Sequence, residues 1–255
     1  MKVESWVITD VGKQRSVNED CHYVDADTGL FLVLDGMGGH RAGEVASRLA
    51  TDTITSFYKE HVADSNNRRD IFENYDSSFT YHANLLRQAA FLANRVVLEK
   101  SLENEETLGM GSTVAGMAVN GFTVSMINVG DSRMYLIRNG LIEQISRDHT
   151  LAEDQVERGL MTREEARESQ LRHILSSVIG VDSRIRVHMD ELVVFPGDVF
   201  ILCTDGLTAV MGDEEILSTI TERGSGAETL QHIVEEANDR GGPDNVTVAI
   251  MKFSQ

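Results

Sequence analysis

The sequence predicts an α+β fold in which antiparallel sheets are covered by helices. Strand-like and helix-like segments come in blocks rather than in regular βαβ alternation, which favours antiparallel sheets. Two Asn-Gly dipeptides, Asn120-Gly121 and Asn139-Gly140, each separate two apolar runs and indicate type I′ hairpin turns. With 255 residues, the chain is long enough for one large domain or two small ones.

The N-terminal part contains the clearest strand, residues 30–34. Five consecutive apolar residues bounded by glycines indicate a buried strand. After it the apolar residues recur at i, i+3, i+4 and i+7, which predicts a long helix over residues 42–57. Further elements expected here are strands at 5–9 and 21–24, a loop at 61–79 and a second amphipathic helix whose inner face spans 85–97.

The rest of the chain begins with a β-meander whose strands flank the two Asn-Gly turns. Residues 151–180 are charged and show no core-facing stripe, so we expect a surface subdomain or flap there. The expected elements are strands at 113–119, 122–129, 133–138, 141–145, 185–194, 199–203 and 246–253, and helices at 151–158, 162–167, 214–221 and 228–238.

Composition narrows the class of protein. The hydrophobic fraction of 41% and charged fraction of 25% are ordinary for a globular protein. A net charge of −18 argues against nucleic-acid binding, which depends on clustered Lys and Arg. Residues 1–10 lack the apolar core of a signal peptide, and no apolar run approaches the ~20 residues that span a membrane. We therefore expect a cytoplasmic protein with neither nucleic-acid nor membrane partners.

Several site types are excluded by spacing. Cys21 and Cys203 have no second cysteine nearby, which makes a zinc ribbon or disulfide framework improbable. Neither cysteine is followed by Arg at the sixth position, so a thiolate phosphatase mechanism is excluded. The segment Gly109-Met110-Gly111-Ser112 is too short for a dinucleotide-binding fingerprint.

Two apolar strands each end in Asp-Gly. Asp35-Gly36 follows residues 30–34, and Asp205-Gly206 follows residues 199–203 after Thr204. An ionised Asp at the end of a buried strand is costly unless it is paired, hydrogen-bonded or bound to a metal. The two strands therefore predict a carboxylate cluster. Oxygen ligands without His or Cys favour hard ions such as Mg²⁺ or Mn²⁺ over zinc.

Seven short motifs, each weak alone, occur in a specific order. They are Arg15…Glu19-Asp20, Asp35-Gly36-Met37-Gly38-Gly39-His40, Gly111-Ser112-Thr113, Val129-Gly130-Asp131-Ser132-Arg133, Asp148-His149, Thr204-Asp205-Gly206 and Gly242-Pro243-Asp244-Asn245. In order and spacing the chain resembles the metal-dependent protein phosphatases of type 2C (the PPM family), in their compact bacterial form. The resemblance runs from Thr9 to the last expected strand.

The resemblance implies a four-layer α/β/β/α sandwich of two antiparallel sheets flanked by helices. It also implies that residues 1–255 form a single phosphatase domain with a flap subdomain at about 151–184. Its activity would be a protein serine/threonine phosphatase that uses a metal-activated water and forms no phospho-enzyme. Phosphorylated proteins and an opposing serine/threonine kinase would be the partners.

The resemblance also assigns roles to residues. Asp35 would bridge two Mn²⁺ or Mg²⁺ ions, with Asp205 and Asp244 on one ion and the Gly36 carbonyl on the other. Asp131, together with Asp205, would hold a possible third ion. Arg15 would bind the substrate phosphate; Glu19 would act through a metal-bound water and Asn245 would support Asp244. The catalytic residues would thus be Arg15, Asp35 and Asp205.

The chain departs from some relatives at one position. Met37 stands where they carry a His that is often assigned as the general acid. His40 and a metal-bound water both remain possible proton donors. Two other functions remain open at this point, a catalytically silent phosphoprotein-binding module and a metallohydrolase for small phosphoesters. Intact Asp35, Asp205 and Asp244 argue against the silent module.

Overall fold

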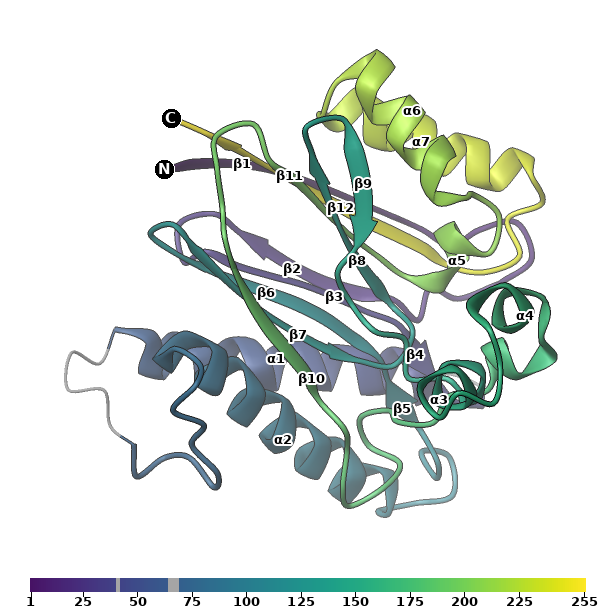
Figure 1. Cartoon of the computed structure of the whole chain (residues 1–255). Helices are drawn as coiled ribbons and strands as arrows, with labels where there is room; N and C mark the ends of the chain where they lie inside the picture. Colours follow the sequence, from purple (N-terminus) through teal and green to yellow (C-terminus); the bar gives the residue numbers. More distant parts are fainter. Residues whose placement is uncertain (40–41, 64–68) are drawn as a thin grey trace.

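The computed structural model describes residues 1–39, 42–63 and 69–255 and shows two five-stranded antiparallel sheets packed face to face (Figure 1). One sheet has the order β1 (Lys2–Asp10), β12 (Val246–Ser254), β11 (Val199–Cys203), β8 (Arg133–Arg138), β9 (Leu141–Gln144). The other has the order β10 (His188–Val193), β7 (Thr123–Val129), β6 (Val114–Asn120), β3 (Leu30–Leu34), β2 (Cys21–Asp25). A short pair, β4 (Gly36–Met37) and β5 (Gly111–Ser112), lies beyond β3.

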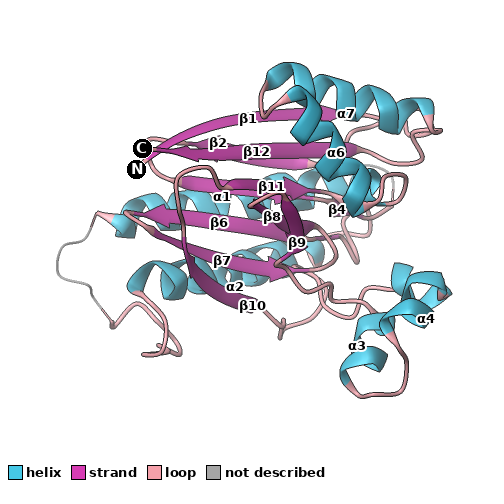
Figure 2. Ribbon diagram, turned by 45° about the horizontal axis from the view of Figure 1, so that its top comes forward, coloured by secondary structure: helices cyan, strands magenta, loops and turns pink. Residues whose placement is uncertain are grey.

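Helices cover the outer face of each sheet (Figure 2). The pair α1 (Ala42–Val62) and α2 (Tyr81–Ser101) packs on the sheet that contains β3. The pair α6 (Asp213–Arg223) and α7 (Ala227–Asp239) packs on the sheet that contains β11. The predicted four-layer α/β/β/α sandwich is confirmed.

The burial of β3 explains its unbroken apolar run. Phe31 and Val33 point into the core between the two sheets, whereas Leu30, Leu32 and Leu34 belong to the core beneath α1 and α2. Both faces of the strand are therefore covered, and a strand that is buried on both sides needs apolar residues at every position.

One of the two Asn-Gly hairpins differs from the prediction. Asn139 and Gly140 both have positive φ (55° and 76°) between the paired residues of β8 and β9, as a type I′ turn requires. In the other hairpin Asn120 still pairs with Thr123, so the two-residue loop is Gly121-Phe122. Only the glycine of that loop has positive φ (63°), the pattern of a type II′ turn. The type I′ prediction was wrong there because β6 continues one residue further than expected.

The segment between β9 and β10 forms three short helices outside both sheets (Figure 1). These are α3 (Leu151–Glu157), α4 (Arg163–Glu168) and the 3₁₀ helix η1 (Gln170–His173). Thr150 and Thr162 cap α3 and α4 through their hydroxyls. Ile179 and Ser112 then exchange two backbone hydrogen bonds of 2.9 Å, so the chain is back on β5 at this point. We call residues 151–175 the flap helices below.

Candidate functional site

The strand ends that carry the predicted carboxylates lie at one end of the sandwich. Figure 1 shows β4, β5, the short helix α5 (Asp205–Thr208) and the flap helices at this end, with both chain termini at the other. The loop between β1 and β2, the β7–β8 turn and the loop before β12 supply the remaining candidate residues.

Asp35 is fixed through its backbone. Its N–H donates to Thr113 Oγ1 (2.9 Å), and its carbonyl accepts from the Thr113 N–H (2.8 Å). The following Gly36 is packed so closely that a Cβ there would lie 2.1 Å from the Gly43 carbonyl oxygen. The backbone is thus held on both sides of Asp35 without using its carboxylate.

Asp205 is the first residue of α5, a helix that the sequence did not predict. A Cβ on the next residue, Gly206, would lie 2.0 Å from the Asn245 carbonyl oxygen, so α5 starts directly against the loop that carries Asp244. Among the described residues, the buried Asp205 Oδ1 has no hydrogen-bond partner.

Glu19 and Asp20 come from the loop before β2. The Glu19 N–H donates to Asn245 Oδ1 (2.8 Å), and the Asn245 amide donates to the carbonyls of Val11 and Val17. Asn245 therefore joins the N-terminal loop to the C-terminal one. The Asn245 N–H also donates to Asp244 Oδ1 (2.8 Å), and its support of Asp244 in the site stays a prediction.

Asp20, for which the sequence predicts no role of its own, lies close enough to Asp205 and Asp244 for their charges to raise its pKa. Its Oδ2 accepts hydrogen bonds from Thr204 Oγ1 (2.9 Å) and Thr247 Oγ1 (2.7 Å). Its Oδ1 is buried and has no hydrogen-bond partner in the described part of the chain, as is also true of Glu19 Oε1. A second carboxylate directly after Glu19 was the available signal.

Arg15 and Asp244 form an ion pair. Arg15 Nη2 donates to Asp244 Oδ2 at 2.7 Å, and the Arg15 side chain is 49% exposed. Asp244 raises the pKa of Arg15, and the charges of Glu19 and Asp35 add to this effect. The guanidinium thus faces the cluster while much of it remains open to solvent, a position suited to an incoming anion.

Asp131 lies in the β7–β8 turn, where Gly130 has φ 93°. Ser132 Oγ bonds to Thr113 Oγ1 at 2.6 Å, which connects this turn to the segment beside Asp35. The Gly130 N–H donates to His149 Nδ1 (3.3 Å), and the His149 N–H donates to the Gly130 carbonyl (2.8 Å). The turn is therefore held on both sides without the Asp131 side chain.

Burial and mutual repulsion perturb the whole cluster. Burial, with the charges of Asp20, Asp205, Asp131 and Asp244, raises the pKa of Asp35 well above its usual range. Burial raises the pKa of both Asp20 and Asp131 to about 7, and the charge of Asp205 adds to each. Burial, together with Asp244, also raises the pKa of Asp205. These carboxylates destabilise one another when ionised.

A bound cation would relieve this repulsion. The buried oxygens Asp20 Oδ1, Asp205 Oδ1 and Glu19 Oε1 have no partner among the described residues, and unpaired buried carboxylate oxygens are costly. Among the described residues, no group of three or more His, Cys, Asp or Glu side chains is placed so that it could hold a metal ion. The donor set thus fits a hard divalent cation in its chemistry, since all of its ligands would be oxygens.

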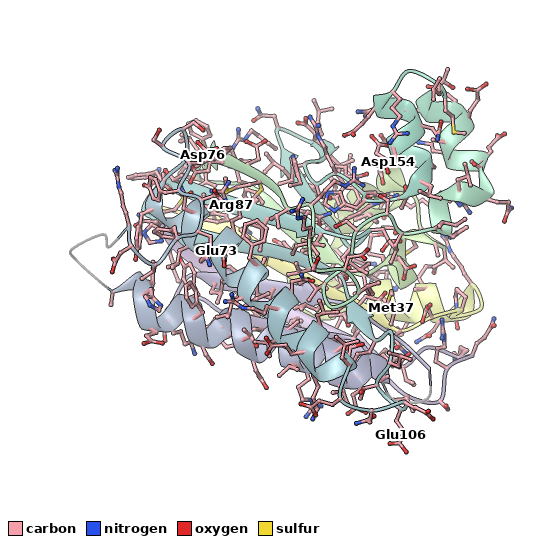
Figure 3. The ribbon with its side chains drawn as sticks, turned by 90° about the horizontal axis from the view of Figure 1, so that it is seen from below. Met37, Glu73, Asp76, Arg87, Glu106 and Asp154 are labelled. Carbon is pink, nitrogen blue, oxygen red and sulfur yellow. The ribbon has the colours of Figure 1, made fainter. Side chains whose placement is uncertain are left out.

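The proton-donor candidate His40 lies outside the described residues. Met37, which replaces the His of some relatives, is part of β4. Figure 3 shows Met37 at the same end of the molecule as Asp154 of α3, with Glu73, Asp76 and Arg87 at the opposite end. His173 in η1 was not predicted as a site residue; it lies near enough to Asp205 to oppose part of the rise that burial causes in the pKa of Asp205.

No helix in the described ranges is both long and apolar enough to cross a membrane.

The sequence profile of protein phosphatase 2C matches residues 12–238. The chain is 31% identical to protein phosphatase PhpP of Streptococcus pneumoniae over 257 residues, covering 99% of this chain and 98% of that protein. It is 34% identical to serine/threonine protein phosphatase PstP of Mycobacterium tuberculosis over 243 residues, which cover 95% of this chain and 43% of PstP.

Solved structures of bacterial serine/threonine phosphatases superpose on this chain over nearly its whole length. The serine/threonine phosphatase Stp1 of Staphylococcus aureus superposes with a TM-score of 0.84 at 31% identity, over 100% of this chain and 96% of Stp1. The catalytic domain of PstP in complex with two manganese ions superposes with a TM-score of 0.80 at 28% identity, over 99% of both chains.

Proposed function

The chain belongs to the protein phosphatase 2C (PPM) family and is a protein serine/threonine phosphatase, and we propose that the carboxylate cluster is the site where it hydrolyses phosphoserine and phosphothreonine. The observation that carries this proposal is that Glu19, Asp20 and Asp205 each have a buried carboxylate oxygen with no hydrogen-bond partner in the described part of the chain, while the charges of Asp20 and Asp205 raise the pKa of the buried Asp35. The Arg15 guanidinium stands at their solvent-facing side.

We propose that the cofactors are two Mn²⁺ or Mg²⁺ ions, with a third possible. Asp35, Asp205, Asp244 and the Gly36 carbonyl would hold the two ions, Asp131 with Asp205 would hold the third, and Glu19 and Asp20 would hold coordinated waters in place. When bound, such ions neutralise phosphoryl oxygens and lower the pKa of a coordinated water. The manganese ions of the PstP complex support this choice.

The residues of the chain itself bind and orient the substrate. The planar Arg15 fork can contact two phosphoryl oxygens at once. Only its Nη2 is bonded, to Asp244 Oδ2, so the other N–H donors of Arg15 can bind the substrate while Asp244 would take part in cation binding. Asn245 would hold the N-terminal loop and the Asp244 loop together, because it bonds to Glu19, Val11 and Val17.

The test is hydrolysis of an aryl phosphate and a phosphothreonine peptide, with Mn²⁺ and with a chelator, together with calorimetry of Mn²⁺ binding. We expect hydrolysis of both substrates only with the metal, and loss of Mn²⁺ binding in Asp35→Asn. A protein that binds the phosphopeptide but leaves it intact at saturating Mn²⁺ would instead be the catalytically silent module.

We further propose that residues 1–255 act as a single phosphatase domain with residues 151–184 as its flap subdomain, and that an opposing serine/threonine kinase is a partner. The PhpP and PstP relatives support the first part through their similarity along this whole chain. The proposal of a kinase partner is tested by measuring the loss of phosphate from an autophosphorylated kinase of the same cell, with and without the enzyme. A cytoplasmic location agrees with the free thiols of Cys21 and Cys203.

A further inference from the structure

A cavity of about 580 Å³ lies beside the carboxylate cluster, between the flap helices and the two sheets. Its core wall comes from β8, β9, β10 and the α5–α6 connection, and its outer wall from α3, α4 and η1. None of the functional roles assigned above uses this space.

Three elements line both the cavity and the proposed catalytic site. Arg133 lines the cavity two residues after Asp131, and Thr208 lines it from α5, whose first residue is Asp205. On the flap side Arg172 lines the cavity, while the adjacent His173 is near enough to affect Asp205. A peptide whose phosphorylated residue reached Asp205 could therefore extend into this cavity.

The flap wall of the cavity carries three arginines and one acidic residue, Glu153 of α3. Arg163 and Arg167 lie one turn apart on α4 and Arg172 follows in η1, and all three line the cavity. None of the three forms an ion pair with a carboxylate in the described ranges; Arg172 instead donates to the Arg167 carbonyl and to His173. Arg163 stands in the first turn of α4, where a cation is unfavourable for the helix dipole, so helix stability does not explain it.

Other arginines around the cavity do have acidic partners. Arg133 bonds to Asp148 (2.7 Å), and Arg147 lies 3.5 Å from Glu157. Arg163, Arg167 and Arg172 form no such ion pair among the described residues, although the charge of Arg163 opposes the rise that burial causes in the pKa of Glu153. They leave a concentration of positive charge beside a site whose substrate is anionic.

The opposite wall carries more acidic than basic side chains: Arg133 is paired there with Asp148, and Arg147 is the other basic residue. Glu143 of β9, Asp190 of β10 and Asp213 of α6 line the core side. An anionic group in the cavity is therefore attracted to the flap wall and repelled from the core wall. This arrangement fixes the side on which such a group can sit.

We propose that the arginines Arg163, Arg167 and Arg172 form an accessory subsite for an anionic side chain, a carboxylate or a second phosphoryl group, next to the phosphorylated residue of the substrate protein. The proposal rests on the proposed function of the carboxylate cluster. It makes substrates with acidic flanking residues the preferred class. Charge-assisted hydrogen bonds to guanidinium are strong enough for such a preference.

The test compares phosphothreonine peptides in which one flanking position at a time is Asn, Asp or phosphoserine, on both sides of the phosphothreonine. For the best-placed position we expect the kcat/KM of the Asp or phosphoserine peptide to exceed that of the Asn peptide about tenfold. In the double variant Arg163→Gln/Arg167→Gln this difference should disappear, with hydrolysis of an aryl phosphate unchanged. The ratio between the Asp and phosphoserine peptides identifies which anion the subsite prefers.

The matched control is Arg158→Gln, because Arg158 is exposed at the end of α3 and does not line the cavity. It should keep the wild-type preference. Equal kcat/KM for all wild-type peptides would overturn the proposal, as would a double variant that slows the Asn, Asp and aryl substrates equally, since the arginines would then act on the fold or on flap closure.

A binding measurement separates this proposal from the proposed function. Fluorescence anisotropy with the same peptides on the metal-free protein needs no hydrolysis. If the peptides are not hydrolysed but the acidic ones still bind more tightly and lose this advantage in the double variant, the proposed function fails and the subsite stands. Tighter binding of the Asn peptide would overturn the subsite.

Discussion

Strands β3 and β11 have nearly the same sequence plan and lead to different local structures. Each is a run of five fully buried residues that brings an Asp-Gly to the same end of the sandwich. After Asp35 the chain stays extended and forms β4, which pairs with β5. After Thr204 it turns, and Asp205 begins helix α5.

The difference comes from what each glycine contacts. Gly36 lies against the Gly43 carbonyl of α1, and Gly206 lies against the Asn245 carbonyl before β12. In both cases the absence of a side chain allows a second segment to come close, and this proximity positions the carboxylate. Both strand ends therefore share a closely packed Asp-Gly. They differ in the secondary structure that follows, because Gly36 packs against α1 whereas Gly206 packs against the loop before β12.

The largest expected effect tests whether the two aspartates are equivalent. Asp35→Asn and Asp205→Asn should each lower Mn²⁺-dependent kcat/KM by roughly 10³-fold, because each removes a proposed charged ligand, which would supply several kcal/mol of cation and transition-state stabilisation. Steady-state kinetics on a phosphothreonine peptide measures this loss. Substantial activity in either variant at saturating Mn²⁺ would place the catalytic site elsewhere.

Asp131 is a third carboxylate of the proposed site. Unlike Asp35 and Asp205, it is not part of an Asp-Gly after a buried strand but lies in the β7–β8 turn. Its turn is held by Ser132–Thr113 and by His149, so Asp131→Ala should leave the fold and the two-metal centre intact. We expect turnover to fall about 10²-fold, because the proposed third cation, weakly held beside the phosphate, would be lost. Calorimetry at high Mn²⁺ should show one fewer weak site. Asp27→Ala, in an exposed turn, is the control, and unchanged turnover in Asp131→Ala would leave Asp131 as a turn residue only.

The pH dependence of the metal-free protein tests the repulsion between the strand ends. Burial raises the folded-state pKa of Asp20 and Asp131 to about 7, above an unfolded value near 3.8, so the folded protein binds more protons in this window. Its free energy of unfolding should therefore rise by roughly 1–3 kcal/mol as pH falls from about 7 towards 4. Urea unfolding with a chelator measures this. Asp35→Asn should weaken the dependence, and a rise of stability with pH would contradict it.

The comparison also shows which parts of the site could be predicted from the sequence. The carboxylates at the strand ends were predictable because an apolar run followed by Asp is a local pattern. The position of Asp20 was not, since its hydroxyl partners Thr204 and Thr247 are 184 and 227 residues away. The helix α5 was missed for a similar reason, because the contact of Gly206 with Asn245 depends on the tertiary fold.

A smaller effect concerns the two glycines. Gly36→Ala and Gly206→Ala should each lower the free energy of unfolding by about 1–3 kcal/mol, because the new Cβ would lie 2.1 or 2.0 Å from a backbone carbonyl oxygen. Gly226→Ala is the matched control, since it has an extended backbone (φ −172°) and no atom within 4 Å of the new Cβ. Urea unfolding compares the three. A loss in only one of the two Asp-Gly variants would show that the strand ends are not equivalent.

The smallest effect is expected at Arg15. This residue belongs to neither strand end, but it contacts Asp244 in the loop against which Gly206 packs. Arg15→Ala should raise the KM for a phosphopeptide about tenfold, because a guanidinium contact with a phosphate dianion is lost. The free energy of unfolding should change by no more than about 1 kcal/mol, since the ion pair is partly exposed to solvent (49% for the Arg15 side chain and 30% for that of Asp244). Mn²⁺ affinity should be kept or slightly increased, because Asp244 is released from its ion pair.

Arg15→Lys distinguishes charge from geometry: a lysine restores the charge without the two-pronged contact, so its KM should lie between those of the wild type and Arg15→Ala. An unchanged KM in Arg15→Ala would make Arg15 a surface residue whose ion pair with Asp244 has no part in substrate binding.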